Sequence, residues 1–314
     1  MKKILALILA VIMAVGIMPM TALAKEYEYE DVSGTAYISI SKDDRYVVSD
    51  GVDAGTIMAY VPVDIAELRN IKLENYTHKD GDTLERFYYD ADNNGKYEIT
   101  VLQLFLYVLD TYYHGTSKEL VIAQGPGSLF MEDGFWGHDL NLTYYKNGSY
   151  PLEREGWGAT ADRISVSNGD FVDVSMYESW NFYGDEKAGY HYFENDSGIT
   201  HEYAAETGKP LAIKYTRAWG NLDIGGATAR VASAGSTIYY GKTLYDETSA
   251  KTVITDANGK AKITFDKGGI YYLWAYGELG VEYEEEIVSS PGYCKVVVEG
   301  GSAPELQKAD HSYR

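Results

Sequence analysis

The stretch Ile164-Ser-Val-Ser-Asn-Gly-Asp-Phe-Val-Asp-Val-Ser-Met176 decides the fold of this chain. Apolar residues alternate with polar ones on both sides of Asn168-Gly169, a dipeptide that favours the tight turns of β-hairpins. Alternation with a period of two places one row of side chains in a core and the other in water, as in a half-buried strand. The stretch therefore predicts two strands joined by a hairpin turn.

The same alternation continues toward the C-terminus. Leu140, Leu142 and Tyr144 alternate before Asn147-Gly148, which is a second hairpin signal. Beyond a soft boundary at residues 206–210, seven segments read as strands, with Asp256-Ala-Asn-Gly259 as the turn between two of them: residues 211–216, 229–232, 237–240, 253–255, 261–265, 270–276 and 293–298. Seven strands in about 90 residues are typical of an immunoglobulin-like sandwich.

One helix interrupts the β pattern. Thr100-Val-Leu-Gln103 is a capping box, in which the threonine and glutamine side chains satisfy amides at a helix start. Apolar residues cover nearly every face of the segment from there to about Tyr113, which predicts a buried helix. Asp64-x-x-Glu67 indicates another helix start. The predicted fold class is mainly β: an α+β first domain with one buried helix, then an immunoglobulin-like β-sandwich.

The N-terminus predicts export. Met-Lys-Lys is followed by an apolar run from Ile4 to Met18, and Ala22-Leu-Ala24 supplies the small residues that signal peptidase needs. We therefore expect a signal peptide over residues 1–24, a secreted or cell-surface protein, and no membrane insertion after cleavage. The remaining division is a first domain over 25–205, a sandwich over 206–299 and a polar tail over 300–314.

The charge composition limits the classes of binding partner. The 314 residues contain 27 Lys and Arg against 47 Asp and Glu, a formal charge of −20. Such a field repels phosphate backbones and anionic lipid, which argues against nucleic-acid and membrane-surface binding. Hard cations, uncharged glycans and basic proteins remain open. The single cysteine, Cys294, alternates with Val296 and Val298, so we expect it to face a core rather than to react.

One loop has the spacing of a calcium site. In Asp90-Ala-Asp92-Asn-Asn94-Gly95-Lys-Tyr-Glu98, oxygens occupy the first, third and fifth places, glycine the sixth, and a carboxylate the ninth. The twelfth place, which normally supplies a bidentate acid, is Val101. Calcium is therefore a possible cofactor, held by Asp90, Asp92, Asn94 and Glu98, and the alternative is a polar turn that uses Asn-Gly for its geometry.

Aromatic residues are the candidate ligand contacts. Flat rings stack on sugar faces, and neighbouring carboxylates and amides can bind hydroxyls. The candidates are Trp136, Trp157, Trp180 and Tyr183. The alternative, which suits most of the surrounding rings (among them Tyr190, Tyr192 and Phe193), is that they fill the core of a β domain.

No catalytic motif is present in the sequence. It has no nucleophile elbow, no zinc-protease helix and no phosphate loop. Glu178, Asp185 and Glu186 could bring two carboxylates together as a glycosidase requires. Acids are so frequent in this chain that such proximity arises by chance, and we therefore expect the protein not to be an enzyme.

The order of several short motifs resembles a known family. Thr100-Val-Leu-Gln-Leu104, Phe135-Trp-Gly137, Tyr144-Tyr-Lys-Asn-Gly148 and Asn168-Gly-Asp-Phe-Val-Asp173 are similar to the transcobalamin C-terminal-like domain, a domain of unknown function in Gram-positive surface proteins. Thr255-Asp-Ala-Asn-Gly-Lys-Ala261 and Gly269-Ile-Tyr-Tyr272 resemble the Ig-like module that often follows it. The resemblance spans roughly residues 55–299. In the animal vitamin carriers this domain closes over a corrinoid held against an α-helical barrel. The single strong helix here does not support a corrinoid.

Three functions remain open at this point. The first is an exported, non-catalytic binding or adhesion protein of a Gram-positive bacterium, whose first domain binds a glycan, a small molecule, or a host or cell-wall protein while the second acts as a spacer. The second is a structural stalk segment of a cell-surface assembly. A glycosidase is the third and is less favoured.

Overall fold

The computed structural model describes residues 27–77, 81–113, 122–125, 128–131, 141–152, 159–177, 189–221, 227–282 and 285–299. Within these ranges the chain is mainly β, which confirms the predicted fold class. The predicted signal peptide and the polar tail lie outside the described residues. No helix in the described ranges has the length and apolar character that crossing a bilayer requires.

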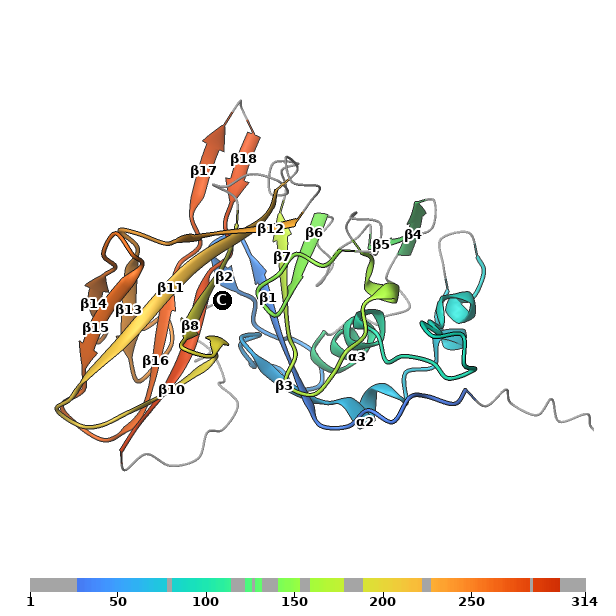
Figure 1. Cartoon of the computed structure of the whole chain (residues 1–314), viewed down its shortest axis with the longest axis horizontal. Coiled ribbons are helices and arrows are strands. Elements are labelled where there is room, and N and C mark those ends of the chain that lie inside the picture. Colours follow the sequence, from blue (N-terminus) through green and yellow to red (C-terminus); the bar gives the residue numbers. More distant parts are fainter. Residues whose placement is uncertain are drawn as a thin grey trace, which may run out of the picture.

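A five-stranded sheet forms the N-terminal half (Figure 1). Its order is β2-β1-β7-β6, and β3 pairs with β1 as well. Strand β1 runs parallel to β7, while the other pairs are antiparallel. The bounds are β1 Thr35–Lys42, β2 Arg45–Tyr46, β3 Val61–Asp64, β6 Asn141–Lys146 and β7 Phe171–Tyr177. A separate hairpin joins β4 Ile122–Gly125 to β5 Ser128–Met131.

The predicted helix packs in the core of this half. Helix α3, Val101–Tyr112, begins with the predicted capping box, in which the Thr100 backbone N–H donates to Gln103 Oε1 at 3.0 Å. Its apolar residues join alternate residues of β1 and β7, such as Ile38 and Val174, in one hydrophobic cluster. The helix start predicted at Asp64 is that of the short helix α2, Ile65–Leu68, where the Asp64 carboxylate accepts from Ala66 N at 2.9 Å. The described residues of this half also form three 3₁₀ turns: η1 Leu73–Asn75, η2 Leu84–Phe87 and η4 Ala161–Arg163.

The predicted hairpin at Asn168-Gly169 is wrong in its pairing. A turn does form there, because Asp170 N donates to Ser167 O at 3.1 Å. The preceding segment, however, bonds beside the start of α3, where Val166 N donates to Ile99 O at 2.7 Å. The neighbours of β7 are β1 and β6 instead. Alternation identified the strand, but the longer-range partners determined where it pairs.

Two five-stranded sheets form the C-terminal half and share one hydrophobic core. One has the order β10-β19-β16-β13-β14. The other has the order β12-β11-β8-β9, with β15 also paired to β11. The seven strands predicted beyond residue 210 all form: β11 Pro210–Asn221, β12 Ala227–Ala232, β13 Thr237–Gly241, β14 Lys251–Ile254, β15 Lys260–Thr264, β16 Gly269–Ala275 and β19 Gly292–Val298. A further hairpin, β17 Leu279–Glu282 with β18 Glu285–Val288, projects from this half (Figure 1).

Three strands before residue 206 pair with this C-terminal half. They are β8 Tyr190–Asn195, β9 Gly198–Ile199 and β10 Glu202–Ala205. Strand β8 is antiparallel to β11, and β10 is parallel to β19. Residues 190–205, which the predicted division assigned to the first domain, therefore contribute strands to both five-stranded sheets of the C-terminal half.

Aromatic side chains fill the junction between the halves. Tyr46 and Tyr60 from the N-terminal half cluster with Trp274 and Tyr293 from the C-terminal half, and all four are buried. The Tyr60 and Tyr190 hydroxyls lie 3.0 Å apart, and Tyr46 Oη donates to the Pro291 carbonyl at 3.1 Å. Because burying each large ring is favourable by about 1.5–3 kcal/mol, this junction holds the two halves together.

Candidate binding pocket

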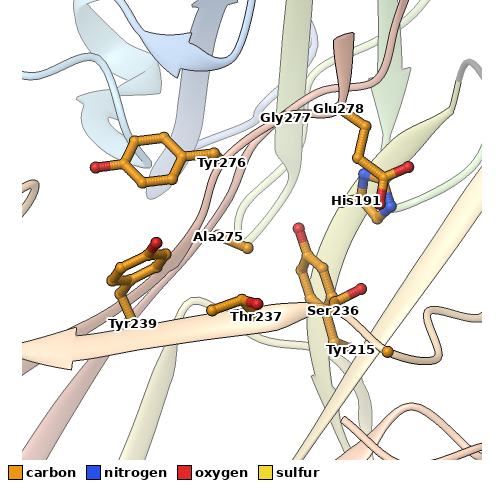
Figure 2. A pocket seen from close by; sticks show the side chains of 10 residues that line it. His191, Tyr215, Ser236, Thr237, Tyr239, Ala275, Tyr276, Gly277 and Glu278 are labelled. Atoms are coloured by element: carbon orange, nitrogen blue, oxygen red, sulfur yellow. The ribbon is translucent and has the colours of Figure 1, made fainter. Parts of the chain in front are cut away.

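A pocket of about 280 Å³ opens in the C-terminal half, close to the junction (Figure 2). The antiparallel register that pairs Tyr239 with Trp274 brings the residues after β16 beside the start of β13. The pairing of β8 with β11 places His191 and Tyr215 on the other side. The lining residues are His191, Tyr215, Gly235, Ser236, Thr237, Tyr239, Ala275, Tyr276, Gly277 and Glu278.

Two tyrosines make a corner in the wall. The ring centroids of Tyr239 and Tyr276 are 5.3 Å apart, and their planes meet at 74°. Each ring is supported from behind: Tyr239 stacks on Trp274 at 5.6 Å, and Tyr276 stacks on Tyr245 at 5.6 Å. Figure 2 shows this corner on one side of the pocket, with His191, Tyr215 and Glu278 on the other. The corner is rigid because both rings have packed neighbours.

His191 is a neutral, fixed group. Its backbone N–H donates to Ser290 Oγ at 2.8 Å, and its Nδ1 lies 3.0 Å from the Ser290 carbonyl oxygen. A carbonyl only accepts, so Nδ1 holds the ring proton and Nε2 keeps a lone pair. Burial, together with the nearby positive charge of Arg217, lowers the pKa of His191 to about 4. The imidazole is therefore uncharged at neutral pH.

Tyr215 and Glu278 add polar chemistry. The Tyr215 ring stacks on His191 at 5.1 Å, and its buried hydroxyl has no hydrogen-bond partner among the described residues. Burial raises the pKa of Tyr215 well above 10, so the hydroxyl stays protonated. Glu278 is exposed, and its backbone N–H donates to Ser289 Oγ at 2.9 Å. The pocket thus combines flat aromatic faces with a phenol, an imidazole and a carboxylate.

The N-terminal half supports the pocket wall at Gly277. The Gly277 backbone N–H donates to the Asp44 carbonyl at 2.9 Å, across the junction. A Cβ at this position would lie 2.2 Å from Ser289 O and 3.0 Å from Asp44 Cα, so only glycine fits between them. The Arg45 guanidinium lies 4.8 Å from the centroid of the Tyr276 ring. The β1–β2 turn therefore positions two residues of the pocket.

The sequence-predicted contact residues are not among the described ones. Trp136, Trp157, Trp180 and Tyr183 are outside the described residues, so their role stays a prediction. Tyr190, Tyr192 and Phe193 are buried, as the alternative interpretation expected.

The proposed calcium loop forms a hydrogen-bonded turn. The Asp90 carboxylate accepts from Asn94 N at 3.0 Å and from Gly95 N at 2.9 Å. Asn94 donates through Nδ2 to Glu30 at 2.7 Å and accepts from Lys96 N. Asp92 is exposed and Glu98 is half-buried. Within the described ranges, no three His, Cys, Asp or Glu side chains gather in a metal-binding arrangement. Calcium binding stays a prediction.

The residues of the pocket were not identified from the sequence. Tyr239 and Tyr276 each sit in or beside a predicted strand, but they meet only because β13 and β16 are neighbours. Strand periodicity gives a residue's face and not the identity of the adjacent strand. The one local signal was Gly277 next to Glu278 at the end of a strand, where glycine marks a close backbone approach.

Comparison with known proteins leaves the family undecided. No protein-family model matches the chain, and no curated protein matches it. The resemblance to the transcobalamin C-terminal-like domain and to an Ig-like module therefore stays a prediction from the sequence.

Proposed function

We propose that the chain is an exported, non-catalytic binding protein whose pocket captures a small molecule or the end group of a glycan. The observation that carries the proposal is the tyrosine corner facing a carboxylate across about 280 Å³ of open space. Ligand sites combine apolar walls with a few fixed polar groups, and this pocket has both. The binding site then lies in the C-terminal half rather than in the first domain.

The test is binding of residues 25–314 to arrays of glycans and small metabolites, with and without Tyr239→Leu. The variant removes one wall of the corner, and we expect it to abolish reproducible hits. Tyr271→Leu is the matched control, because Tyr271 is a half-buried tyrosine of the same sheet that packs on Phe265, outside the pocket lining. Hits that survive Tyr239→Leu would place the binding surface elsewhere, and an array without hits would refute the proposal.

A structural spacer is the second candidate, and the junction favours it. The halves are joined by buried rings and by hydrogen bonds such as Tyr46 to Pro291, which would resist bending. This function requires stiffness and no ligand. Stretching single molecules would separate the two: a spacer unfolds in one high-force step with or without any small molecule, whereas a binding protein gains unfolding force when its ligand is present.

A further inference from the structure

We propose that the pocket selects a small organic cation, such as a protonated amine or a quaternary ammonium group. This inference rests on the proposed function, because it names the ligand class of the same pocket. Three independent observations carry it: the orientation of the rings, the charge of the lining residues, and an internal cation that already uses the same aromatic cluster.

The rings offer their faces to the pocket from more than one direction. Tyr239 and Tyr276 meet at 74°, so a group placed in their corner faces both rings. Tyr215 lies on the opposite side (Figure 2), where its ring packs on His191 at 5.1 Å and on Phe193 at 4.8 Å, so the two faces that form the corner are those of Tyr239 and Tyr276. Aromatic faces carry negative charge density and attract cations within about 6 Å of the centroid. An arrangement of several tyrosines around a small space is therefore suited to an ammonium group.

The charge of the residues that line the pocket also favours a cationic ligand. Among the described residues that line the pocket, Glu278 is the one with a full charge at neutral pH, since His191 is buried and neutral. No lysine or arginine is among these lining residues. Just outside, Glu247 accepts a hydrogen bond from the Tyr276 hydroxyl at 2.6 Å, which makes that ring more electron-rich. An anionic ligand would be repelled by the Glu278 carboxylate in the lining.

The molecule already places a cation on this cluster. The Arg45 guanidinium lies 4.8 Å from the centroid of Tyr276 and 5.5 Å from that of Tyr245. Asp44, with a carboxylate oxygen 3.6 Å from Arg45, balances the arginine charge. The same ring cluster therefore accepts one cation from the chain itself, and the pocket side of Tyr239 and Tyr276 offers a second place. The chain charge of −20 draws cations toward it.

The test compares choline with 3,3-dimethylbutan-1-ol, which has the same shape and lacks the charge. Both are titrated calorimetrically into residues 25–314 at low salt. We expect choline to bind at least tenfold more tightly than the alcohol. Glu278→Gln should weaken choline fivefold or more and leave the alcohol unchanged, whereas the exposed Glu299→Gln, distant from the lining residues, should change neither.

The outcomes separate this inference from the proposed function. Equal binding of choline and the alcohol, or no effect of Glu278→Gln on choline, would overturn the cation inference while a ligand site remains. Binding of neutral sugars with no binding of choline would do the same. Absence of binding for every probe would overturn the proposed function as well.

Discussion

Asp173 is a buried carboxylate in the junction, and Asp173→Asn should change how stability depends on pH. Its side chain is 4% exposed on β7, and neither oxygen has hydrogen-bond geometry to a described residue, although the hydroxyls of Tyr190, Ser39 and Tyr60 are near. Burial raises the pKa of Asp173 from 3.8 to about 7. The charged form is therefore disfavoured in the folded protein.

The sign and size of the effect follow from proton linkage. Between pH 3.8 and 7 the folded chain holds a proton on Asp173 that the unfolded chain has released, so stability falls as the pH rises through this window. One pKa unit corresponds to about 1.4 kcal/mol, so the total loss is about 4 kcal/mol at pH 8. Asparagine keeps the shape without a charge. The free energy of unfolding of Asp173→Asn, measured relative to the parent, should therefore rise by about 4 kcal/mol between pH 4 and pH 8.

His191 changes the stability in the opposite direction over nearly the same pH range. Because its pKa falls from 6.5 to about 4, the unfolded chain takes up a proton that the folded chain does not, and stability falls as the pH drops below 6.5. That contribution is about 3 kcal/mol. In the parent protein the two slopes nearly cancel between pH 4 and 6.5. His191→Phe should therefore expose a fall in stability with rising pH, and Asp173→Asn should expose a rise.

The assay is urea unfolding of residues 25–314 and of both variants at pH 4.5, 5.5, 6.5 and 8. Differences from the parent at each pH remove the contribution of all other titrating groups. A constant difference across this range for Asp173→Asn would refute the buried, protonated carboxylate. If the difference in stability from the parent changed with pH in the same direction for both variants, the opposed contributions of Asp173 and His191 would be refuted.

Three further outcomes are expected from the packing. Gly277→Ala places a Cβ 2.2 Å from the Ser289 carbonyl oxygen and should lower stability by about 2 kcal/mol or more in thermal unfolding. In the control Gly241→Ala the new Cβ makes ordinary contacts at 3.6 Å, so the loss of stability should be about 1 kcal/mol or less. Equal losses in the two variants would contradict the close approach at Gly277. Cys294, fully buried with its pKa raised by burial, should react with a thiol reagent only at the rate of unfolding, and fast labelling of the folded chain would contradict this. Leu106→Ala in α3 should cost about 3 kcal/mol in urea unfolding, because Leu106 is fully buried, and a cost below about 1 kcal/mol would show that the helix is not part of the core.

The sequence predicted those elements whose signals are local. Helix α3 starts at Thr100 because the Gln103 side chain, three residues further on, accepts from the Thr100 backbone N–H. The turn at Asp256 forms because its carboxylate accepts from Asn258 N and Lys260 N, while Gly259 adopts a positive φ of 68°. In both cases the determining contacts lie within a few residues. Such contacts can be read directly from the order of side chains.

Strand pairings between segments distant in sequence escaped prediction. Strand β1 pairs in parallel with β7, from Tyr37 with Phe171 to Lys42 with Met176, and no local pattern specifies a partner so far along the chain. Strand β10 pairs with β19 for the same kind of reason. Alternation is equally compatible with many partners, and the choice depends on how all the sheets bury their apolar faces together. The pocket could not be predicted for the same reason, because its walls come from strands that are not consecutive in the sequence.

The junction also bears on which half carries the function. Gly277 and Tyr276 belong to the pocket, yet Asp44 bonds to the first and Arg45 lies over the second, both from the N-terminal half. A wall that is held from across the junction keeps its geometry only while the halves are docked. If a ligand requires this geometry, its binding stabilises the docked arrangement of the two halves. By linkage, docking strengthens ligand binding by the same free energy. If the proposed function is right, binding and docking form one coupled equilibrium, and the second half is then more than a passive spacer for the first.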